Sequence, residues 1–323
     1  MKKIGLLSTA LILALSVIAS CSQGGSKAST IRLDYAYYSP LSLVIKEKGW
    51  AEEAFAEDKV EVTWVLSQGS NKALEFLNSN SIDLGSAAGA AALISKSKGT
   101  PIEGVYISNK PEWTALVKAD GSSIQSVSDL VGKKVAATVG TDPHIFLLRA
   151  LDEAGIAAKD VEIVNLQHND GATSLVTGQV DAWAGLDPHM ARVELENNAE
   201  LFYRNVDFNT YGFLLARNDF AKKNPEKVEK ILAVYEKARL WTLENMEEAT
   251  AILAKEANLS PEVAKKQMER NDFTQPVPGD AQRNTITEAG KVLQQNQIIK
   301  SDVKLDELVN NLIQPSFAEK VVK

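Results

Sequence analysis

Hydrophobic and polar positions alternate with two different periods from residue 31 onward. Residues 31–35 alternate as a half-buried strand does, and residues 60–66 are rich in β-branched and aromatic side chains. Residues 41–55, between these strands, carry apolar side chains at helical spacing, and residues 71–78 do the same. Strands that alternate with helices predict an α/β fold with a largely parallel sheet.

The same alternation continues through the middle of the chain. We predict a helical C-terminal third from Asn224, because apolar residues recur near a 3.6-residue period there. Before it, the pattern predicts helices at 90–97, 145–154 and 172–177 and strands at 82–85, 102–108, 114–118, 135–139, 161–166 and 180–184.

Two segments about a hundred residues apart resemble each other. Residues 77–87 and 176–185 each run from a helix end through a turn to a hydrophobic–Asp pair, at Asp83 and Asp181, and then to a short strand. This separation is too long for a solenoid repeat. We interpret the echo as two similar α/β lobes, the alternative being that any helix–turn–strand unit has this pattern.

The N-terminus indicates export. Lys2 and Lys3 precede a largely apolar stretch over residues 4–18, which is too short to span a membrane and fits a secretory signal. Small residues lead to Cys21, as in a bacterial lipobox, in which the cysteine becomes the lipidated first residue of the mature protein. We predict a lipoprotein signal peptide over 1–20 and a flexible tether over 21–30; the alternative is a plain signal peptide with a chance cysteine.

Composition narrows the function. The 323 residues contain 35 Lys and Arg against 42 Asp and Glu, and this acidic balance disfavours a nucleic-acid partner. The single cysteine excludes an internal disulfide and a cysteine-based metal cluster, and the three histidines show no metal-binding spacing. The chain also lacks the sequence signatures of serine hydrolases, phosphate-binding loops and zinc proteases. We predict no metal, no cofactor and no catalytic activity.

Three predicted strand-to-helix junctions have a composition suited to binding an anion. Residues 67–70, 85–89 and 140–144 combine glycine with Ser or Thr, so that backbone N–H groups, hydroxyls and a helix dipole are available to a ligand. Such junctions lie at the carboxyl ends of strands, where α/β proteins bind ligands. The alternative is that each is an ordinary helix cap. The predicted contacts are Ser39, Ser67, Gln68, Gly69, Ser86, Ala87, Gly140 and Thr141.

Aromatic and titratable residues accumulate near the same places. We predict that Tyr38, Trp113, Trp183 and Tyr211 wall the organic part of a ligand, although aromatic residues at such positions also form cores. Asp187, followed by a proline, either accepts a cationic group of the ligand or caps a helix. For His144, the alternatives are donation to an anion and exposure to solvent.

Several stretches together resemble a known family. The segments at 82–85, 126–136, 140–151 and 178–188 include the strings SVSDLVGKKVA and VDAWAGLDP. These residues resemble the extracytoplasmic solute-binding proteins of ABC importers, in the subgroup that binds aliphatic sulfonates, taurine, nitrate and thiamine-precursor pyrimidines.

The resemblance implies a type II periplasmic-binding-protein fold. Each lobe would be a mostly parallel sheet flanked by helices, with lobe 1 formed by 31–115 and 212–323, lobe 2 by 116–211, and two crossovers at the hinge. The ligand would sit between lobes that close over it. The family also implies a monomer outside the cytoplasmic membrane that docks on a permease with its ATPase.

The function expected from this resemblance is to bind a small organosulfur anion, an aliphatic sulfonate or taurine, and to deliver it for import. A thiamine pyrimidine precursor, nitrate or another nitrogen or sulfur solute is the alternative within the same role. An enzyme of the pyrimidine-synthase type is a further alternative, but such enzymes use a cysteine-rich iron motif that this sequence lacks. A receptor that signals to a partner is the third.

Overall fold

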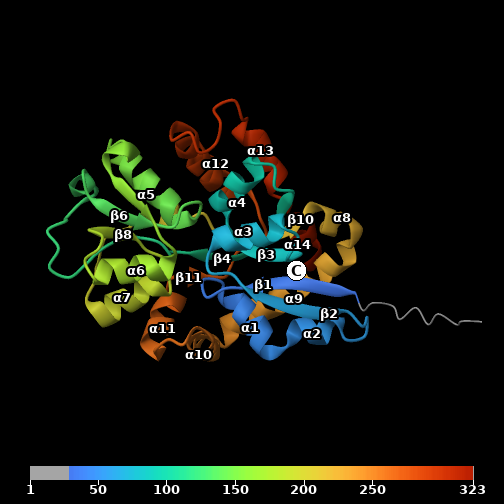
Figure 1. Ribbon diagram of the computed structural model, residues 1–323. Helices are drawn as coiled ribbons and strands as arrows, with labels where there is room; N and C mark the ends of the chain where they lie inside the picture. The colour runs from blue at the N-terminus through green and yellow to red at the C-terminus, as the bar shows by residue number, and fades with distance from the viewer. Residues whose placement is uncertain (1–28, 323) are drawn as a thin grey trace, which may run out of the picture.

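The computed structural model describes residues 29–322, and Figure 1 shows two bodies of helices and strands side by side. The predicted signal peptide, the lipidation site Cys21 and most of the tether lie outside the described residues. Within the described part, no helix is long and apolar enough to cross a membrane.

The larger sheet has six strands in the order β11-β4-β10-β3-β1-β2. Strands β1, β2 and β3 are mutually parallel, while β10 runs antiparallel between β3 and β4. The strands are β1 (Thr30–Tyr35), β2 (Glu61–Leu66), β3 (Leu84–Ala88), β4 (Ile102–Pro111), β10 (Gly212–Arg217) and β11 (Asn271–Asp272).

The smaller sheet has five strands in the order β7-β6-β8-β5-β9. Here β5 is the strand inserted antiparallel, between β8 and β9, and β6 pairs parallel with β7 and β8. The strands are β5 (Leu116–Lys118), β6 (Lys134–Ala137), β7 (Glu162–Asn165), β8 (Ala182–Ala184) and β9 (Glu200–Tyr203).

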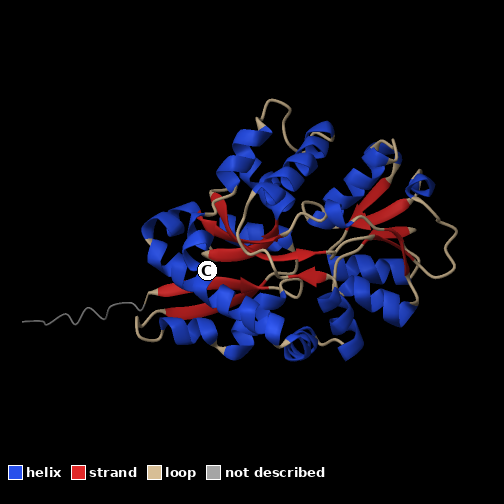
Figure 2. Cartoon of the chain, turned by 180° about the vertical axis from the view of Figure 1, so that it is seen from behind, coloured by secondary structure: helices blue, strands red, loops and turns tan. Residues whose placement is uncertain are grey.

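Helices flank both sheets, as Figure 2 shows from the opposite side. The predicted two-sheet α/β architecture is confirmed. The helices are α1 (Pro40–Lys48), α2 (Trp50–Phe55), α3 (Ser70–Asn78), α4 (Gly89–Ser97), α5 (Asp142–Glu153), α6 (His168–Val176), α7 (His189–Asn197), α8 (Asn218–Lys223), α9 (Pro225–Glu244), α10 (Met246–Ala257), α11 (Pro261–Glu269), α12 (Asp280–Gln295), α13 (Leu305–Leu312) and α14 (Ser316–Val321), with 3₁₀ turns at Val127–Leu130, Ala158–Asp160 and Val206–Phe208.

Several predicted elements have other bounds in the structure. The helix predicted over 172–177 begins four residues earlier, at His168. The helix predicted over 41–55 is divided at Gly49, whose φ of 66° ends α1 with its N–H bonded to the carbonyls of Ile45 and Lys46. The strand predicted at 82–85 lies instead at Leu84–Ala88. Ser86 and Ala87 are therefore inside a buried strand rather than in a junction, and α4 begins only at Gly89.

The internal echo has a structural equivalent in both sheets. Asp83, just before β3, accepts the backbone N–H of Arg32 at 2.9 Å and donates its own N–H to the Arg32 carbonyl at 2.7 Å. Asp181, just before β8, makes the same pair of bonds with Lys134, at 2.8 and 2.8 Å. Each aspartate thus sets the register between two neighbouring parallel strands, which supports the interpretation of two similar lobes.

The two bodies share part of the hydrophobic core. Ile145 and Leu148 of α5 belong to one buried cluster with Leu93 of α4 and Ile286 of α12. The first sheet is built from residues 30–111, 212–217 and 271–272 and the second from 116–203. The exact division into lobes at 115/116 and 211/212 stays a prediction.

Candidate functional site

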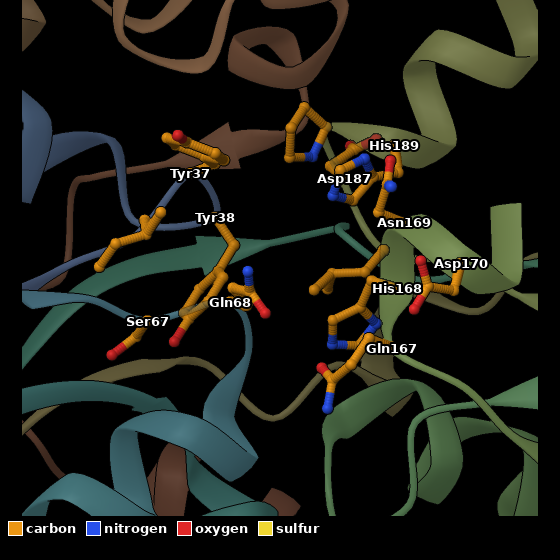
Figure 3. A pocket seen from close by; sticks show the side chains of 13 residues that line it. Tyr37, Tyr38, Ser67, Gln68, Gln167, His168, Asn169, Asp170, Asp187 and His189 are labelled. Atoms are coloured by element: carbon orange, nitrogen blue, oxygen red, sulfur yellow. The ribbon is translucent and has the colours of Figure 1, made fainter. Parts of the chain in front are cut away.

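A cavity of about 390 Å³ lies between the carboxyl ends of the strands of the two sheets. Figure 3 shows residues of the first sheet, including Tyr38 and Gln68, facing residues of the second, including His168 and Asp187, across this space. The lining residues are Tyr37, Tyr38, Leu66, Ser67, Gln68, Gln167, His168, Asn169, Asp170, Leu186, Asp187, Pro188 and His189.

Four helices begin beside the cavity. Tyr37 and Tyr38 precede α1, Ser67 and Gln68 precede α3, Gln167 precedes α6, and Pro188 precedes α7. The first N–H groups of a helix have no partner within the helix, and the helix dipole places partial positive charge there. Among the described residues, no lysine or arginine lines the cavity. The helix N-termini therefore supply partial positive charge to a lining that also holds the carboxylates of Asp170 and Asp187.

Of the predicted contacts, Tyr38, Ser67, Gln68 and Asp187 line the cavity. The Tyr38 hydroxyl donates to the Ser86 carbonyl at 3.0 Å, which fixes the ring against β3. Gly69 lies in the same loop as Ser67 and Gln68, and a Cβ at its position would be 2.8 Å from His168 Nε2.

Asp187 is already paired with a cation of the protein. Both of its carboxylate oxygens lie 3.2 Å from Arg270 Nη1, and Oδ1 accepts the N–H of Ala191 at 2.9 Å. Burial raises the pKa of Asp187 to about 6, and the nearby Arg270 opposes that rise. In this structure Arg270 therefore pairs with the carboxylate that we predicted to accept a cationic group of the ligand.

The other small polar residues are placed around the cavity rather than on its wall. Ser39 is buried at the start of α1, and its hydroxyl has no hydrogen-bond partner in the part of the chain that the structure describes. Ser86 donates its N–H to Asp34 at 2.8 Å within the sheet, beside Ala87. Gly140 has a φ of 83°, and Thr141 precedes α5 with its hydroxyl donating to the Thr138 carbonyl at 2.6 Å.

The predicted aromatic residues differ in their positions. Trp113 packs edge-on against Tyr38, with ring centroids 5.9 Å apart, and donates to Asp142 at 2.9 Å. Tyr211 belongs to the same buried cluster. Trp183 is fully buried in a separate cluster under the second sheet. Trp113 and Tyr211 thus support the wall from behind, while Trp183 packs in the core of the second body.

His144 is buried in α5, and no group of residues 29–322 forms a hydrogen bond with its Nδ1. Burial lowers the pKa of this imidazole to about 4, so the ring is neutral near pH 7. It is not among the residues that line the cavity.

Sequence reasoning missed the wall formed by α6 and by the start of α7. Gln167, His168, Asn169 and Asp170 form a continuous polar run directly after the predicted strand at 161–166. The run contains no glycine, and we had expected glycine at a binding junction. A polar run that follows a predicted strand was the signal that could have identified it.

The described residues contain no group of three His, Cys, Asp or Glu side chains arranged to hold a metal ion. The residues that line the cavity supply hydroxyls, amides, imidazoles and the carboxylates of Asp170 and Asp187, a set suited to binding a small polar molecule.

Known proteins share this architecture over most of the chain. An aliphatic sulfonates-binding protein of Escherichia coli is 28% identical over 314 residues, covering 96% of this chain and 97% of that protein. The crystal structure of the periplasmic aliphatic sulphonate binding protein SsuA from E. coli aligns with a TM-score of 0.76 at 27% identity, over 89% of this chain and 92% of that one. The SsuA structure from Xanthomonas axonopodis, bound to MOPS, has a TM-score of 0.80 at 23% identity and covers 88% and 98% of the two chains.

These relatives confirm the predicted fold and are binding proteins rather than enzymes, as expected. The family model described as NMT1/THI5 like matches residues 40–249, and the chain belongs to this family.

Proposed function

We propose that this protein is the extracytoplasmic solute receptor of an ABC importer and that it binds a small organosulfur anion, an aliphatic sulfonate or taurine. The observation that carries the proposal is the convergence of four helix N-termini on one cavity, whose wall within the described chain contains no lysine or arginine. The sulfonate-binding relatives support the same ligand class.

The anion would lie among the N-termini of α1, α3, α6 and α7. No described hydrogen bond uses the backbone N–H groups of Gly69, Ser70 or Asn71 at the start of α3. A sulfonate has three oxygens that accept such bonds, and a helix N-terminus favours a negative charge without a paired cation. The Tyr37 and Tyr38 rings, with Leu66 and Leu186, offer apolar surface to the organic part of the ligand.

Delivery to a permease and attachment through a lipid on Cys21 complete the proposal. The lipobox-like spacing before Cys21 supports the anchor. Acyl chains hold such a protein at a membrane without a polybasic segment when more than one chain is attached. A soluble body on a tether would then capture solute close to its transporter.

A thermal-shift screen of the purified protein tests the ligand class. The panel contains methane- to octanesulfonate, taurine, nitrate, sulfate and a hydroxymethylpyrimidine. A ligand at a hundred times its Kd stabilises the folded state by about 2.7 kcal/mol, so we expect a sulfonate to raise Tm by several degrees.

Sulfate is the matched control, because it carries the anionic oxygens without the organic part. A shift with the pyrimidine and none with any sulfonate would overturn the proposed ligand and favour the alternative solute. A shift with sulfate as large as with the sulfonates would show that the Tyr37 and Tyr38 surface plays no part in recognition.

A further inference from the structure

The imidazole ring of His168 places a buried nitrogen, Nε2, in the wall of the cavity. The side chain is 1% exposed, and Nε2 has no hydrogen-bond partner among the described residues. Figure 3 shows the ring turned toward the wall that carries Gln68. A Cβ at position 69 would come within 2.8 Å of this nitrogen, so only glycine leaves it room on that side.

The other ring nitrogen identifies the tautomer. His168 Nδ1 lies 3.1 Å from the hydroxyl oxygen of Thr138, and that hydroxyl lies 2.6 Å from the Leu166 carbonyl oxygen. A hydroxyl has one proton, and a carbonyl oxygen can only accept. The Thr138 proton is therefore donated to Leu166, and the bond to His168 requires that Nδ1 carry the imidazole proton.

A neutral imidazole with its proton on Nδ1 has a lone pair on Nε2. Burial, with a smaller contribution from the neighbouring His189, lowers the pKa of His168 to about 3, so the ring is neutral near pH 7. The wall that faces the Ser67–Gly69 loop thus contains a fixed hydrogen-bond acceptor.

We propose that His168, held in the Nδ1–H tautomer by Thr138, selects solutes that carry a hydrogen-bond donor besides their anionic group. Such donors are a hydroxyl, an amine or a ring N–H. This inference rests on the proposed function, which it sharpens from aliphatic sulfonates in general to hydroxy- or amino-substituted ones. A donor on the solute gives this buried acceptor a hydrogen bond that an unsubstituted alkyl chain cannot provide, so the donor-bearing solute binds more tightly.

Two isosteric ligand pairs test the proposal by calorimetry on the purified protein. In 2-hydroxyethanesulfonate a hydroxyl replaces the terminal methyl of propanesulfonate, and 3-hydroxypropanesulfonate stands in the same relation to butanesulfonate. In at least one of the two pairs, we expect the hydroxylated sulfonate to bind roughly threefold to tenfold more tightly than its alkyl partner, as for one hydrogen bond to a buried acceptor. Equal or weaker binding of the hydroxylated member in both pairs would overturn the proposal.

Two variants assign the preference to His168. His168→Phe keeps a ring but removes the acceptor, and we expect the ratio of the two affinities to fall to about one. Thr138→Val keeps the shape of its side chain but frees the tautomer, and we expect the ratio to decrease because Nε2 can then be protonated. A purely structural role would weaken both members of a pair equally and leave the ratio unchanged.

The ¹⁵N NMR spectrum of the imidazole rings tests the tautomer without a ligand. The protein has three histidines, and loss of one set of signals in His168→Phe assigns this ring. We expect Nδ1 protonated and Nε2 unprotonated near pH 7; the reverse would overturn the inference. If the sulfonates do not bind at all but Nε2 is unprotonated, the proposed function fails while the acceptor on the wall is established.

Discussion

Asp34 is a carboxyl group buried behind the site in the first sheet. It is 1% exposed and accepts the N–H of Ser86 at 2.8 Å and the Ser86 hydroxyl at 3.0 Å. Burial raises its pKa to about 7, against the opposing effect of these hydrogen bonds. Tyr38, which lines the cavity, donates its hydroxyl to the carbonyl of the same Ser86. Ser86 therefore connects the Asp34 carboxyl to the cavity wall.

The raised pKa of Asp34 predicts a specific pH dependence. Between pH 4 and 7 the carboxyl is ionised in the unfolded chain but protonated in the folded one, so its contribution to stability falls as pH rises. We expect Asp34→Asn to remove this loss. The unfolding free energy of the variant, relative to wild type, should rise by up to about 1.4 kcal/mol per pH unit across this window.

Denaturant unfolding at several pH values measures this difference. Asp129→Asn is the control, because hydrogen bonds from Gln125 and Ser126 lower the pKa of the exposed Asp129 and move its titration below the window. A difference between Asp34→Asn and wild type that is flat from pH 4 to 7 would contradict the assignment.

At the scale of single residues, the sequence identified part of the site. Ser67 and Gln68 were predicted from a glycine and hydroxyls that follow a strand, and they line the cavity. The partner of Asp187 was not predictable, because Arg270 is 83 residues away in the chain and only the tertiary fold brings the two together. A local pattern shows which groups can bind but not which of them the protein itself already satisfies.

At the scale of elements, Asp83 and Asp181 perform the same local task in different surroundings. Each accepts the backbone N–H of a residue on the neighbouring parallel strand. Asp83 is buried and also pairs with Arg32 at 2.6 Å and Arg217 at 3.4 Å. The Asp181 side chain is 41% exposed, and its nearest cation, Lys133, is 3.9 Å away.

This contrast predicts unequal costs for the same substitution. We expect Asp83→Asn to lower the unfolding free energy by about 3 kcal/mol, because Arg32 loses its charge partner and the buried Arg217 keeps Asp219 alone. Asp181→Asn should cost under about 1 kcal/mol, as for an exposed pair in water. Equilibrium unfolding of the two variants provides the comparison, each serving as the control for the other; equal costs would show that the backbone bond, and not burial of the charge, dominates.

The accuracy of the predicted element boundaries depended on how much of each segment shows a regular hydrophobic pattern. The β2 strand and the long α9 helix were predicted within a residue or two because alternation or a helical period extends over their length. Strand β3 is LGSAA, buried on both faces, so it has neither alternation nor large side chains to mark it. For the same reason its residues were interpreted as a junction.

At the scale of the whole molecule, two sets of contacts join the bodies on either side of the cavity. On one side α5 packs against α4 and α12 through apolar side chains. On the other, α7 packs against α11, and Arg270 bonds to Asp187 at 3.2 Å and to Glu194 at 2.5 Å. Apolar contacts of the first kind tolerate a range of relative positions of the two bodies. The ion pairs of Arg270 form only when the two bodies are in one relative position.

The general arrangement could be predicted because it follows from element order and from the resemblance of extended motifs. The antiparallel placement of β10 and β5 could not, since β10 returns to the first sheet only after the whole second sheet, and β5 pairs with strands that come much later in the chain. Nor could the polar link through Arg270, which lies in the C-terminal third that the sequence predicts only as helical. Residues that act between bodies carry no local signature of that role.

Arg270 provides the test of whether this polar link holds the two bodies closed over a ligand. In Arg270→Met the buried Asp187 loses its charge partner and Glu194 keeps only Lys266, at 3.2 Å, so the closed arrangement becomes less favourable. Because a less populated closed state lowers the apparent affinity in proportion, we expect the Kd for the best ligand to rise on the order of tenfold. Calorimetry measures the affinity, and small-angle X-ray scattering should give a larger radius of gyration for the ligand-free variant than for wild type.

Arg283→Met is the matched control, since Arg283 bonds Asn310 at 2.7 Å within the first body. If both variants kept the wild-type affinity and size, the ion pair of Arg270 with Asp187 would play no part in holding the two bodies closed.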